Sequence, residues 1–465
     1  MRIVKAPASA LLLVLLLGYT STDTNSQSKS RMVIPATPAG QRLAEFLRAY
    51  NTGDLSVVRK FVAENFDKSA LEKRSAGERA STNVATFELT RQLSPHSVVR
   101  STDFELEALC QSQVTEAWFS ITIQVAPQSP HGIIRQSFGF ATRPADAVPR
   151  GRLNRAQIIK ELNAYVAKLV AADMLSGAVL VARDGKPIFK RAYGLNDSRT
   201  ANRIDTKFDL ASMSKMFTSV AIAQLVQQGK LSYDDTIGKL LPEYPNRQAA
   251  EKVTLHHLLT HTSGIVDFLD KQGYQAARHG GTGTFRTMQD WFPFFASDPL
   301  SFEPGAKNDY SNGNFIVAGA VIEKITGQSY FDYVREHIFK PAGMSDTVFT
   351  VGNGNSAGGG LSTVDDLLKF DIALRRHRLL SAKYTDIILT PKVSTGEGEG
   401  YGYGFETSQV NGKRIVGHSG GTTEVDNKFD AYLDDGYTVI ALTKPHASKN
   451  VTRKIKELIT QGSGF

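Results

Sequence analysis

The 465-residue sequence contains a single cysteine, Cys110, and this scarcity excludes an internal disulfide framework and any cysteine-rich zinc site. Neither charge sign dominates, because 54 lysines and arginines stand against 46 aspartates and glutamates, for a formal net charge of +8. The basic residues are scattered and form no dense run, so we do not expect nucleic acid as a partner. With 41% hydrophobic residues the composition is globular, which excludes a mainly disordered chain, a collagen-like chain and a long coiled coil.

Long apolar runs are absent except near the N-terminus. Arg2 and Lys5 precede an apolar run over residues 8–17, a pattern typical of a secretory signal peptide. The run is shorter than the about 20 residues that span a bilayer, although an uncleaved membrane anchor is the alternative interpretation. We expect residues 1–31 to be a signal peptide with a flexible leader. The mature chain, without a membrane span, would be exported to a periplasmic or extracellular space, which a lone cysteine suits.

Residues 38–145 are expected to form a first folded unit. Its start carries apolar residues at helical spacing, and strand-like stretches follow over residues 103–109, 114–125 and 132–141. Helices followed by strands predict a small accessory α+β domain. The opening FLRAYNTGD followed by long strands resembles the NTF2-like fold. A proline-rich and arginine-rich stretch near residues 142–153 is expected to be a linker.

The second unit, residues 154–461, carries strand patterns at both ends and helical patterns between them. A hairpin is predicted around Asp184-Gly185, since this dipeptide separates two β-rich runs. Further strands are predicted near the C-terminus, over residues 401–406, 413–416, 427–433 and 437–442. Helices are predicted in the middle, over residues 216–228, 254–260, 314–326, 330–338 and 363–376. This order predicts an α/β fold of the α+β type, with an antiparallel sheet flanked by helices and an inserted helical lobe.

The first motif that carries chemistry is Ser212-Met-Ser-Lys215. A serine and a lysine three residues apart share one helix face. We expect Ser212 at the helix N-terminus, where free N–H groups favour developing negative charge. A desolvated lysine can be neutral and accept the serine proton. Alone, the pattern also fits a capping serine beside a solvated lysine.

Two further motifs lie at loop positions. Tyr310-Ser-Asn312 follows a Pro-Gly turn and precedes an apolar helix. A tyrosine near an ammonium group can have a lowered pKa and act as acid or base, and an asparagine offers both a donor and an acceptor. His418-Ser-Gly-Gly421 follows a strand, and its glycines allow a ligand to approach the backbone closely. Either motif alone also fits an ordinary turn.

In this order, the three motifs resemble the serine β-lactamase-like superfamily of penicillin-binding proteins, class C β-lactamases and related esterases and D-amino-acid peptidases. Tyr-Ser-Asn replaces Ser-Asp-Asn, and His-Ser-Gly replaces Lys-Thr-Gly, and the tyrosine is typical of the class C branch. The segments LLTHTSGI, FEPGAKNDYSNGNF, GGGLSTVDDLLKF and GHSGGT are also similar to this group. The resemblance covers residues 154–460.

The resemblance implies three catalytic residues. Ser212 would be the acylated nucleophile, Lys215 would deprotonate it or tune Tyr310, and Tyr310 would act as acid and base, including for the deacylating water. The backbone N–H groups of Ser212 and Gly421 would form the oxyanion hole, where one donor typically contributes about 3 kcal/mol. No metal and no cofactor would be needed.

The resemblance also implies the substrate-binding residues. Asn312 would orient the lysine and bind the substrate's amide, and His418, Ser419 and Gly420 would line the strand on which substrate docks. A lysine in place of His418 would present a fixed cation to a β-lactam carboxylate, whereas a histidine is mostly neutral at pH 7. This departure weakens the case for efficient β-lactam hydrolysis and leaves esters, D-amino acid amides and peptides open.

Three other patterns permit different interpretations. Residues 417–421 fit the G-x-S-x-G motif of α/β-hydrolases, but a strand-like stretch follows where that motif needs a helix. His257 and His261 lie four residues apart but lack the glutamate of an H-E-x-x-H zinc helix. The glycine run over residues 352–360 lacks the Gly-Lys-Ser/Thr end of a P-loop. We expect a loop beside the sheet there, with Ser362 or Thr363 capping a helix.

The sequence thus predicts an exported serine hydrolase that cleaves an ester or amide through an acyl-enzyme on Ser212. Its partner would be a small-molecule or peptide substrate, with an ester, a D-amino acid peptide and a β-lactam all open. Two alternatives from other classes stay open: a non-catalytic binding or sensor protein that retains the penicillin-binding fold, and a ligand-binding role for the N-terminal unit.

Overall fold

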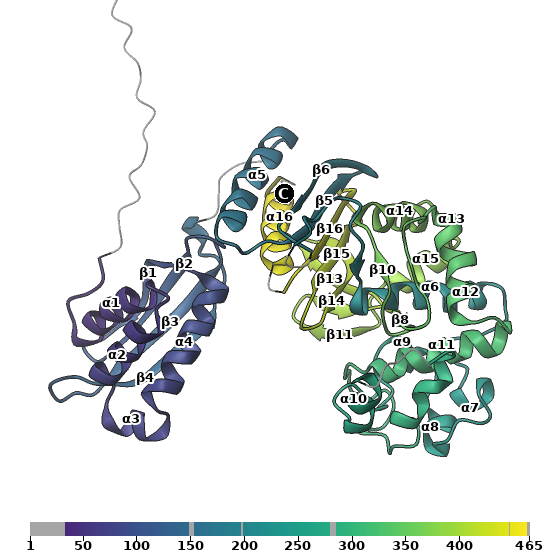
Figure 1. Cartoon of the computed structure of the whole chain (residues 1–465), viewed down its shortest axis with the longest axis horizontal. Helices are drawn as coiled ribbons and strands as arrows, with labels where there is room; N and C mark the ends of the chain where they lie inside the picture. Colours follow the sequence, from purple (N-terminus) through teal and green to yellow (C-terminus); the bar gives the residue numbers. More distant parts are fainter. Residues whose placement is uncertain (1–32, 148–152, 197–198, 280–284, 446, 463–465) are drawn as a thin grey trace, which may run out of the picture.

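The computed structural model describes residues 33–147, 153–196, 199–279, 285–445 and 447–462 (Figure 1). The expected signal peptide and leader, residues 1–31, lie outside these ranges. The described residues form two bodies, one before and one after the stretch near residues 142–153. Across the described ranges, every helix is too short or too polar to cross a membrane.

The first body is a four-stranded antiparallel sheet in the order β1-β2-β3-β4 with helices packed on it. Every second residue of β3 from Phe119 to Val125 is buried in the core shared with the helices, as the alternation of apolar residues predicts. Asp54 caps the second helix through its side chain. The elements are α1 (Pro38–Tyr50), α2 (Leu55–Asn65), α3 (Lys68–Lys73), α4 (Ala76–Thr90), β1 (Leu93–Ser101), β2 (Glu105–Ser112), β3 (Trp118–Val125) and β4 (Ile133–Phe140).

The second body is built on an eight-stranded antiparallel sheet in the order β11-β12-β13-β14-β15-β16-β5-β6. The last strand pairs with the first strand of this body over seven residues, so the sheet is assembled from both ends of the segment as predicted. The strands are β5 (Gly177–Arg183), β6 (Lys186–Tyr193), β11 (Val393–Gly396), β12 (Glu399–Tyr401), β13 (Glu406–Val410), β14 (Lys413–Gly421), β15 (Asp426–Tyr432) and β16 (Tyr437–Thr443).

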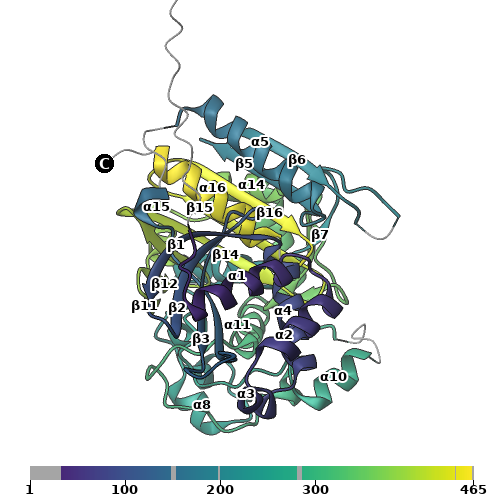
Figure 2. The same cartoon turned by 90° about the vertical axis from the view of Figure 1, so that its left-hand side faces the viewer.

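Helices cover both faces of the central strands. In β5, Ala178, Leu180 and Ala182 face one core, whereas Val179 and Val181 face another, shared with α5 (Arg155–Ala171) and α16 (Ser448–Gly462). A strand buried on both faces needs a continuous apolar run, which GAVLVA supplies. Figure 2 shows α5 and α16 side by side over this outer face.

The middle of the segment supplies the other helices. Those from α7 to α11 gather in a lobe beside the sheet (Figure 1), and α14 packs on β5 and β16. These helices are α6 (Lys215–Gln227), α7 (Ile237–Leu240), α8 (Arg247–Lys252), α9 (Leu255–Leu259), α10 (Gln272–His279), α11 (Asn312–Thr326), α12 (Tyr330–Val334), α13 (Lys340–Ala342), α14 (Val364–Arg375) and α15 (Ala382–Leu389).

Several predicted boundaries were wrong. Of the strand predicted over residues 401–406, only the two end residues lie in strands. Residues 402–405 form a turn between β12 and β13, closed by the Gly402 N–H donating to the Phe405 carbonyl. Gly404 has a positive φ of 68°, which glycine tolerates and which breaks the strand. The helix predicted over residues 330–338 passes from α12 into a π-helical segment, Arg335–Phe339. The structure also adds α3, α4 and β1.

The strand β14 is paired on both sides only along its first half. Its pairing with β13 ends at Gly417, opposite Glu406, whereas its pairing with β15 continues to Gly421. The backbone of residues 418–421 therefore has one edge that no strand of the described residues covers. At this edge Gly420 packs directly on the loop before Ser212, since an added Cβ atom would lie 2.2 Å from the Leu210 carbonyl oxygen.

The two bodies meet at the turn between β2 and β3. The Tyr165 hydroxyl of α5 donates to the Thr115 carbonyl at 2.9 Å. Glu116 pairs with Lys168 of α5 at 2.6 Å and with Lys454 of α16 at 2.7 Å. The N-terminal body thus docks on the two helices that cover the outer face of the second sheet.

The contact of Gly420 with the nucleophile loop gives a stability prediction. Gly420→Ala places a methyl group against a backbone carbonyl that cannot rotate away, so we expect the free energy of unfolding to fall by about 2 kcal/mol. Gly421→Ala is the matched control, because its Cβ atom would meet only the Val425 carbonyl oxygen at 3.9 Å. Urea unfolding of both variants checks this, and equal midpoints would contradict it.

Candidate active site

Ser212 lies in a 3-10 turn, Ala211–Ser214, directly before α6. Ala211 has a positive φ of 48°, a left-handed conformation that costs a non-glycine residue about 1–2 kcal/mol. The turn is held by the Asp209 carboxylate, which accepts the Ala211 N–H at 2.7 Å, and by the Leu210 N–H, which donates to the Gly360 carbonyl. Backbone strain held in this way is typical of functional positions.

Lys215 begins α6, and its side chain is completely buried. Its Nζ atom lies 3.1 Å from Ser212 Oγ, 2.7 Å from Asn312 Oδ1 and 2.5 Å from the Ala357 carbonyl oxygen. Burial lowers the pKa of Lys215 to about 7, against the opposing attraction of the Asp267 and Glu406 carboxylates. A large fraction of this amine is therefore neutral at physiological pH.

Tyr310 lies in the loop before α11, and its hydroxyl is hydrogen-bonded to the side chain of Ser212. Lys215 Nζ lies over the face of the Tyr310 ring, 4.8 Å from the ring centroid. Although 42% of the residue is exposed, desolvation by the surrounding protein raises its pKa above the usual value, against the lowering effect of the Ser212 hydrogen bond. The expectation that a nearby ammonium lowers this pKa was wrong, because desolvation outweighs any such effect and the lysine contacts the ring face.

Asn312 is the first residue of α11, and its side-chain amide has a fixed orientation. Its Nδ2 group donates to Asp267 Oδ2 at 2.8 Å, so that Oδ1 faces Lys215. The same Asp267 oxygen accepts the Asn312 backbone N–H at 2.9 Å. Asp267 was not among the predicted residues, since a single aspartate in a loop carries no sequence signal.

His418 is almost completely buried, with 1% exposure, and lies beneath the site. Its Nε2 atom is 2.9 Å from the Tyr401 hydroxyl and its Nδ1 atom is 2.5 Å from the Ser419 carbonyl oxygen. Burial, helped by repulsion from Lys215 and opposed by attraction to Glu406, lowers the pKa of His418 to about 4. The residue is thus neutral at pH 7 and supplies no fixed cation.

Ser419 points to the opposite face of the strand from His418. Its hydroxyl and its backbone N–H both donate to Glu406 Oε1, the latter at 3.1 Å. Backbone groups of alternate residues point to the same side of an antiparallel strand, so the Gly421 N–H points to the same uncovered edge as that of Ser419. Glu406 is a second residue that the motifs did not reveal.

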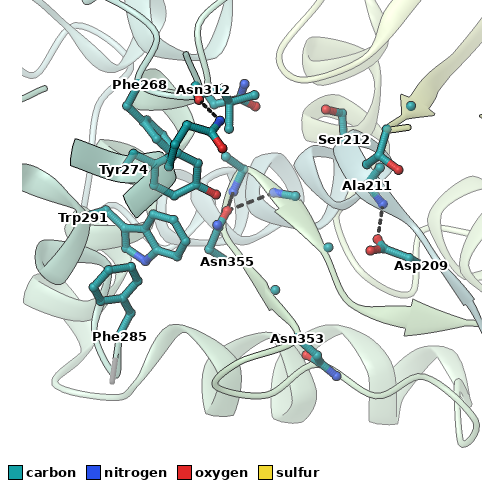
Figure 3. Close-up of a pocket in the computed structure, with 18 of the residues that line it drawn as sticks. Asp209, Ala211, Ser212, Phe268, Tyr274, Phe285, Trp291, Asn312, Asn353 and Asn355 are labelled. Atoms are coloured by element: carbon teal, nitrogen blue, oxygen red, sulfur yellow. Dashed lines mark hydrogen bonds between the residues drawn. The ribbon is translucent and has the colours of Figure 1, made fainter. Parts of the chain in front are cut away.

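A cavity of about 380 Å³ lies beside Ser212 and Gly421 (Figure 3). Aromatic side chains line one side of it, and the glycine-rich loop over residues 352–359 lines another. Figure 3 shows the rings opposite Ser212, with Asn353 and Asn355 on the loop side. The aromatic residues are Phe268, Tyr274, Phe285 and Trp291.

A second cavity of about 670 Å³ lies on the other side of Tyr310. Tyr310 and His261 line it together with Glu406 and Ser419, and α16 closes its far side. Ser212 lines the first cavity and Tyr310 lines the second, so the hydrogen bond between these two side chains connects the walls of the two cavities.

The other sequence patterns have structural roles. His257 accepts the Thr254 N–H in a capping box, and His261 accepts the Ser311 N–H through Nδ1. The glycine run forms two short strands, β8 (Gly354–Asn355) and β9 (Gly358–Gly359), and Thr363 caps α14. Within the described ranges, three or more potential metal ligands do not gather at any point.

Comparison of the sequence with known proteins identifies a family that matches this chain. The family described as Beta-lactamase matches residues 157–444, more than half of the chain. Penicillin-binding protein 4* of Bacillus subtilis is 29% identical over 330 residues, covering 61% of this chain and 71% of the relative. Esterase EstB of Burkholderia gladioli is 36% identical over 208 residues, covering 42% of this chain and 53% of the relative.

A solved structure extends the similarity to the fold. The D-stereospecific amidohydrolase from a Streptomyces species matches with a TM-score of 0.54 and 26% identity, over 67% of this chain and the whole of that one. The antiparallel sheet with its flanking helices and inserted lobe is the predicted fold. With the match to residues 157–444 and the arrangement of Ser212, Lys215 and Tyr310, the chain belongs to the Beta-lactamase family of serine hydrolases.

Proposed function

We propose that the protein is an exported serine hydrolase that cleaves an ester or amide through an acyl-enzyme on Ser212. The observation that carries the proposal is the position of Ser212 Oγ between a buried lysine amine and a tyrosine hydroxyl. A neutral amine has two N–H groups, and the Asn312 and Ala357 oxygens accept both. The remaining lone pair then faces Ser212 Oγ, as a general base requires.

The proton transfers balance over one catalytic cycle. In acylation Lys215 takes the proton of Ser212, whose oxygen attacks the carbonyl carbon, and the Tyr310 hydroxyl protonates the leaving group. In deacylation the Tyr310 oxygen takes a proton from the attacking water, and the Lys215 ammonium returns its proton to Ser212 Oγ. A tyrosine with a raised pKa is protonated in the free enzyme, as a proton donor must be. The two amide N–H groups of Ser212 and Gly421 would bind the oxyanion.

The substrate class is proposed from the site and from the relatives. One relative is an esterase and one structural neighbour is a D-stereospecific amidohydrolase, which supports an ester or an amide. The neutral His418 weighs against efficient β-lactam hydrolysis. We further propose that residues 1–31 direct export and that residues 38–145 form an accessory domain, NTF2-like, beside the hydrolase domain over residues 154–461.

The aromatic cavity supports a preference for the acyl part of the substrate. Phe285 and Trp291 lie in contact with a ring-centroid separation of 4.7 Å, and both rings line the space beside Ser212. Apolar and aromatic walls favour an aryl or long acyl chain over an acetyl group.

Replacing the nucleophile gives the direct test of the proposed function. Ser212→Ala should abolish turnover of p-nitrophenyl esters and D-aminoacyl amides, because no acyl-enzyme can form. Ser219→Ala is the control, since this serine lies in α6 one turn beyond Lys215 and its hydroxyl has no hydrogen-bond partner. Intact-mass spectrometry with an activated ester should show an adduct that turns over, and peptide mapping should place it on Ser212.

The other outcomes of this test separate the alternatives. A persistent adduct would indicate an acylated sensor, and no adduct with any substrate would favour a binding protein. An adduct on Ser419 would indicate the G-x-S-x-G interpretation. Turnover by Ser212→Ala at the wild-type rate would refute the proposed function.

The lowered pKa of Lys215 predicts a pH dependence. Since the neutral amine is the base, kcat/KM for a neutral ester should rise through about pH 7 and reach a plateau above it. The Asp267 carboxylate raises the Lys215 pKa, so Asp267→Asn should move the rise to lower pH. Asp270→Asn, an exposed carboxylate at the same cavity, should leave it in place. A rise that moves to higher pH in Asp267→Asn would contradict this assignment.

The aromatic wall predicts acyl-chain selectivity. Phe285→Ala should reduce kcat/KM for a phenylacetyl ester about fivefold, because one ring contact is worth about 1 kcal/mol. The acetyl ester of the same leaving group is the control and should change much less. Equal losses for both esters would show that the ring does not contact the acyl chain.

A further inference from the structure

Glu406 lines the second cavity together with Tyr310 and Ser419. It is the first residue of β13, opposite Gly417, at the point where β13 stops covering β14. Its side chain reaches along the uncovered edge and accepts both the backbone N–H and the hydroxyl of Ser419. The two donors that Ser419 could offer to a substrate are therefore held by a carboxylate of the chain itself.

Glu406 carries a negative charge at neutral pH. Although burial acts to raise its pKa, His418, Lys428 and the hydrogen bond from Ser419 together hold the pKa well below the usual range. Lys428 is shared, since its Nζ atom contacts Glu406 Oε2 and lies 3.6 Å from Asp430 Oδ1. Burial raises the pKa of Asp430, so the negative charge of the cluster lies mainly on Glu406. Lys428 contacts Oε2 of Glu406, whereas Oε1 faces Ser419 and the uncovered edge.

Other charged groups line the cavity farther from Ser419. Arg453 of α16 is bound to Glu457 and to the Thr115 carbonyl oxygen. The remaining charged residues of the lining carry both signs, so they do not reverse the local charge beside Ser419. They are Glu399, Asp426, Lys449 and Lys456.

The second cavity lies on the leaving-group side of the site. Tyr310, the proposed proton donor to the leaving group, lines this cavity, whereas Ser212 and Gly421 line the aromatic one. A leaving group that receives its proton from Tyr310 therefore departs past Ser419 and Glu406. A carboxylate on that group would lie in the same cavity as the Glu406 carboxylate, beside Tyr310 and Ser419.

We propose that Glu406 is a specificity-determining residue that makes the leaving-group subsite reject anionic groups and admit neutral or cationic ones. The inference rests on the proposed function and names its substrate class: esters or amides whose leaving group carries no carboxylate beside the scissile bond. Like charges brought together in a partly desolvated site are strongly unfavourable, whereas neutral groups can lie beside the Glu406–Ser419 pair without that penalty.

Two esters that differ in one charge test the proposal. The 3-carboxyphenyl and 3-carbamoylphenyl esters of phenylacetic acid share their acyl group, and their leaving groups have nearly the same shape. We expect the wild type to favour the neutral ester by about 30-fold or more in kcat/KM. Glu406→Gln keeps the shape and an acceptor for Ser419 but removes the charge, so it should reduce this preference to within about threefold.

Ser419→Ala is the matched control. It removes the hydroxyl that bonds to Glu406 but leaves the carboxylate in place, so the preference for the neutral ester should stay near the wild-type value. An unchanged preference in Glu406→Gln, or a wild type that hydrolyses both esters equally well, would overturn the proposal. Loss of the preference in Ser419→Ala alone would assign it to the hydroxyl and would also overturn it.

A salt titration of the wild type tests the proposal without any variant. Local repulsion predicts that added salt accelerates hydrolysis of the anionic ester and leaves the neutral ester unchanged. The net charge of +8 predicts the opposite for long-range steering, since screening would then slow the anionic ester. Slowing of the anionic ester by salt would therefore contradict local repulsion. Failure of the proposed function is distinct, because neither ester would then turn over or leave an adduct on Ser212.

Discussion

The site depends on one buried amine with three oxygen neighbours. Burial without water contact destabilises the charged form of a lysine. Here two carbonyl oxygens accept hydrogen bonds from the amine, and two carboxylates at longer range stabilise its charged form. The elements that supply these groups come from three separate parts of the chain: α6, the start of α11 and the glycine-rich loop. The position of the amine therefore fixes how α6, α11 and the glycine-rich loop pack together.

A second layer of carboxylates holds the groups that touch the nucleophile. Asp209 supports the strained turn before Ser212, Asp267 orients the amide of Asn312, and Glu406 holds Ser419. Each of these acids accepts at least one backbone N–H group, and each comes from a loop or a strand end. Because each is tied to the backbone in this way, the side chains near the nucleophile have little freedom to rearrange.

The sequence predicted the fold and the residues that belong to the motifs, but not the residues that hold those side chains in position. Ser212 and Lys215 share a helix turn, so their proximity follows from the period of the helix. The sheet was predicted from strand patterns at both ends of the segment.

The sequence did not predict the roles of Asp267, Glu406 and Ala357, because each acts through a tertiary contact. The role of a backbone carbonyl, such as that of Ala357, cannot be inferred from the residue type. The raised pKa of Tyr310 was missed for a related reason, since the sequence does not show whether an amine faces a ring or a hydroxyl. The prediction of a strand over residues 401–406 was wrong because Gly402 and Gly404 form a turn that interrupts a strand-like run.

The pairing of β5 with β16 has a consequence for how the molecule is made. Residues 177–183 pair with the neighbouring strand β6 on one side, whereas their partners on the other side are residues 437–443, far later in the sequence. Contacts between segments so distant in sequence are slow to form, because the intervening chain must first be ordered. The central sheet, and with it the strand edge beside Ser212, cannot close until residues 437–443 have been synthesised. In the export that we propose, the hydrolase would therefore remain open and inactive until this pairing forms.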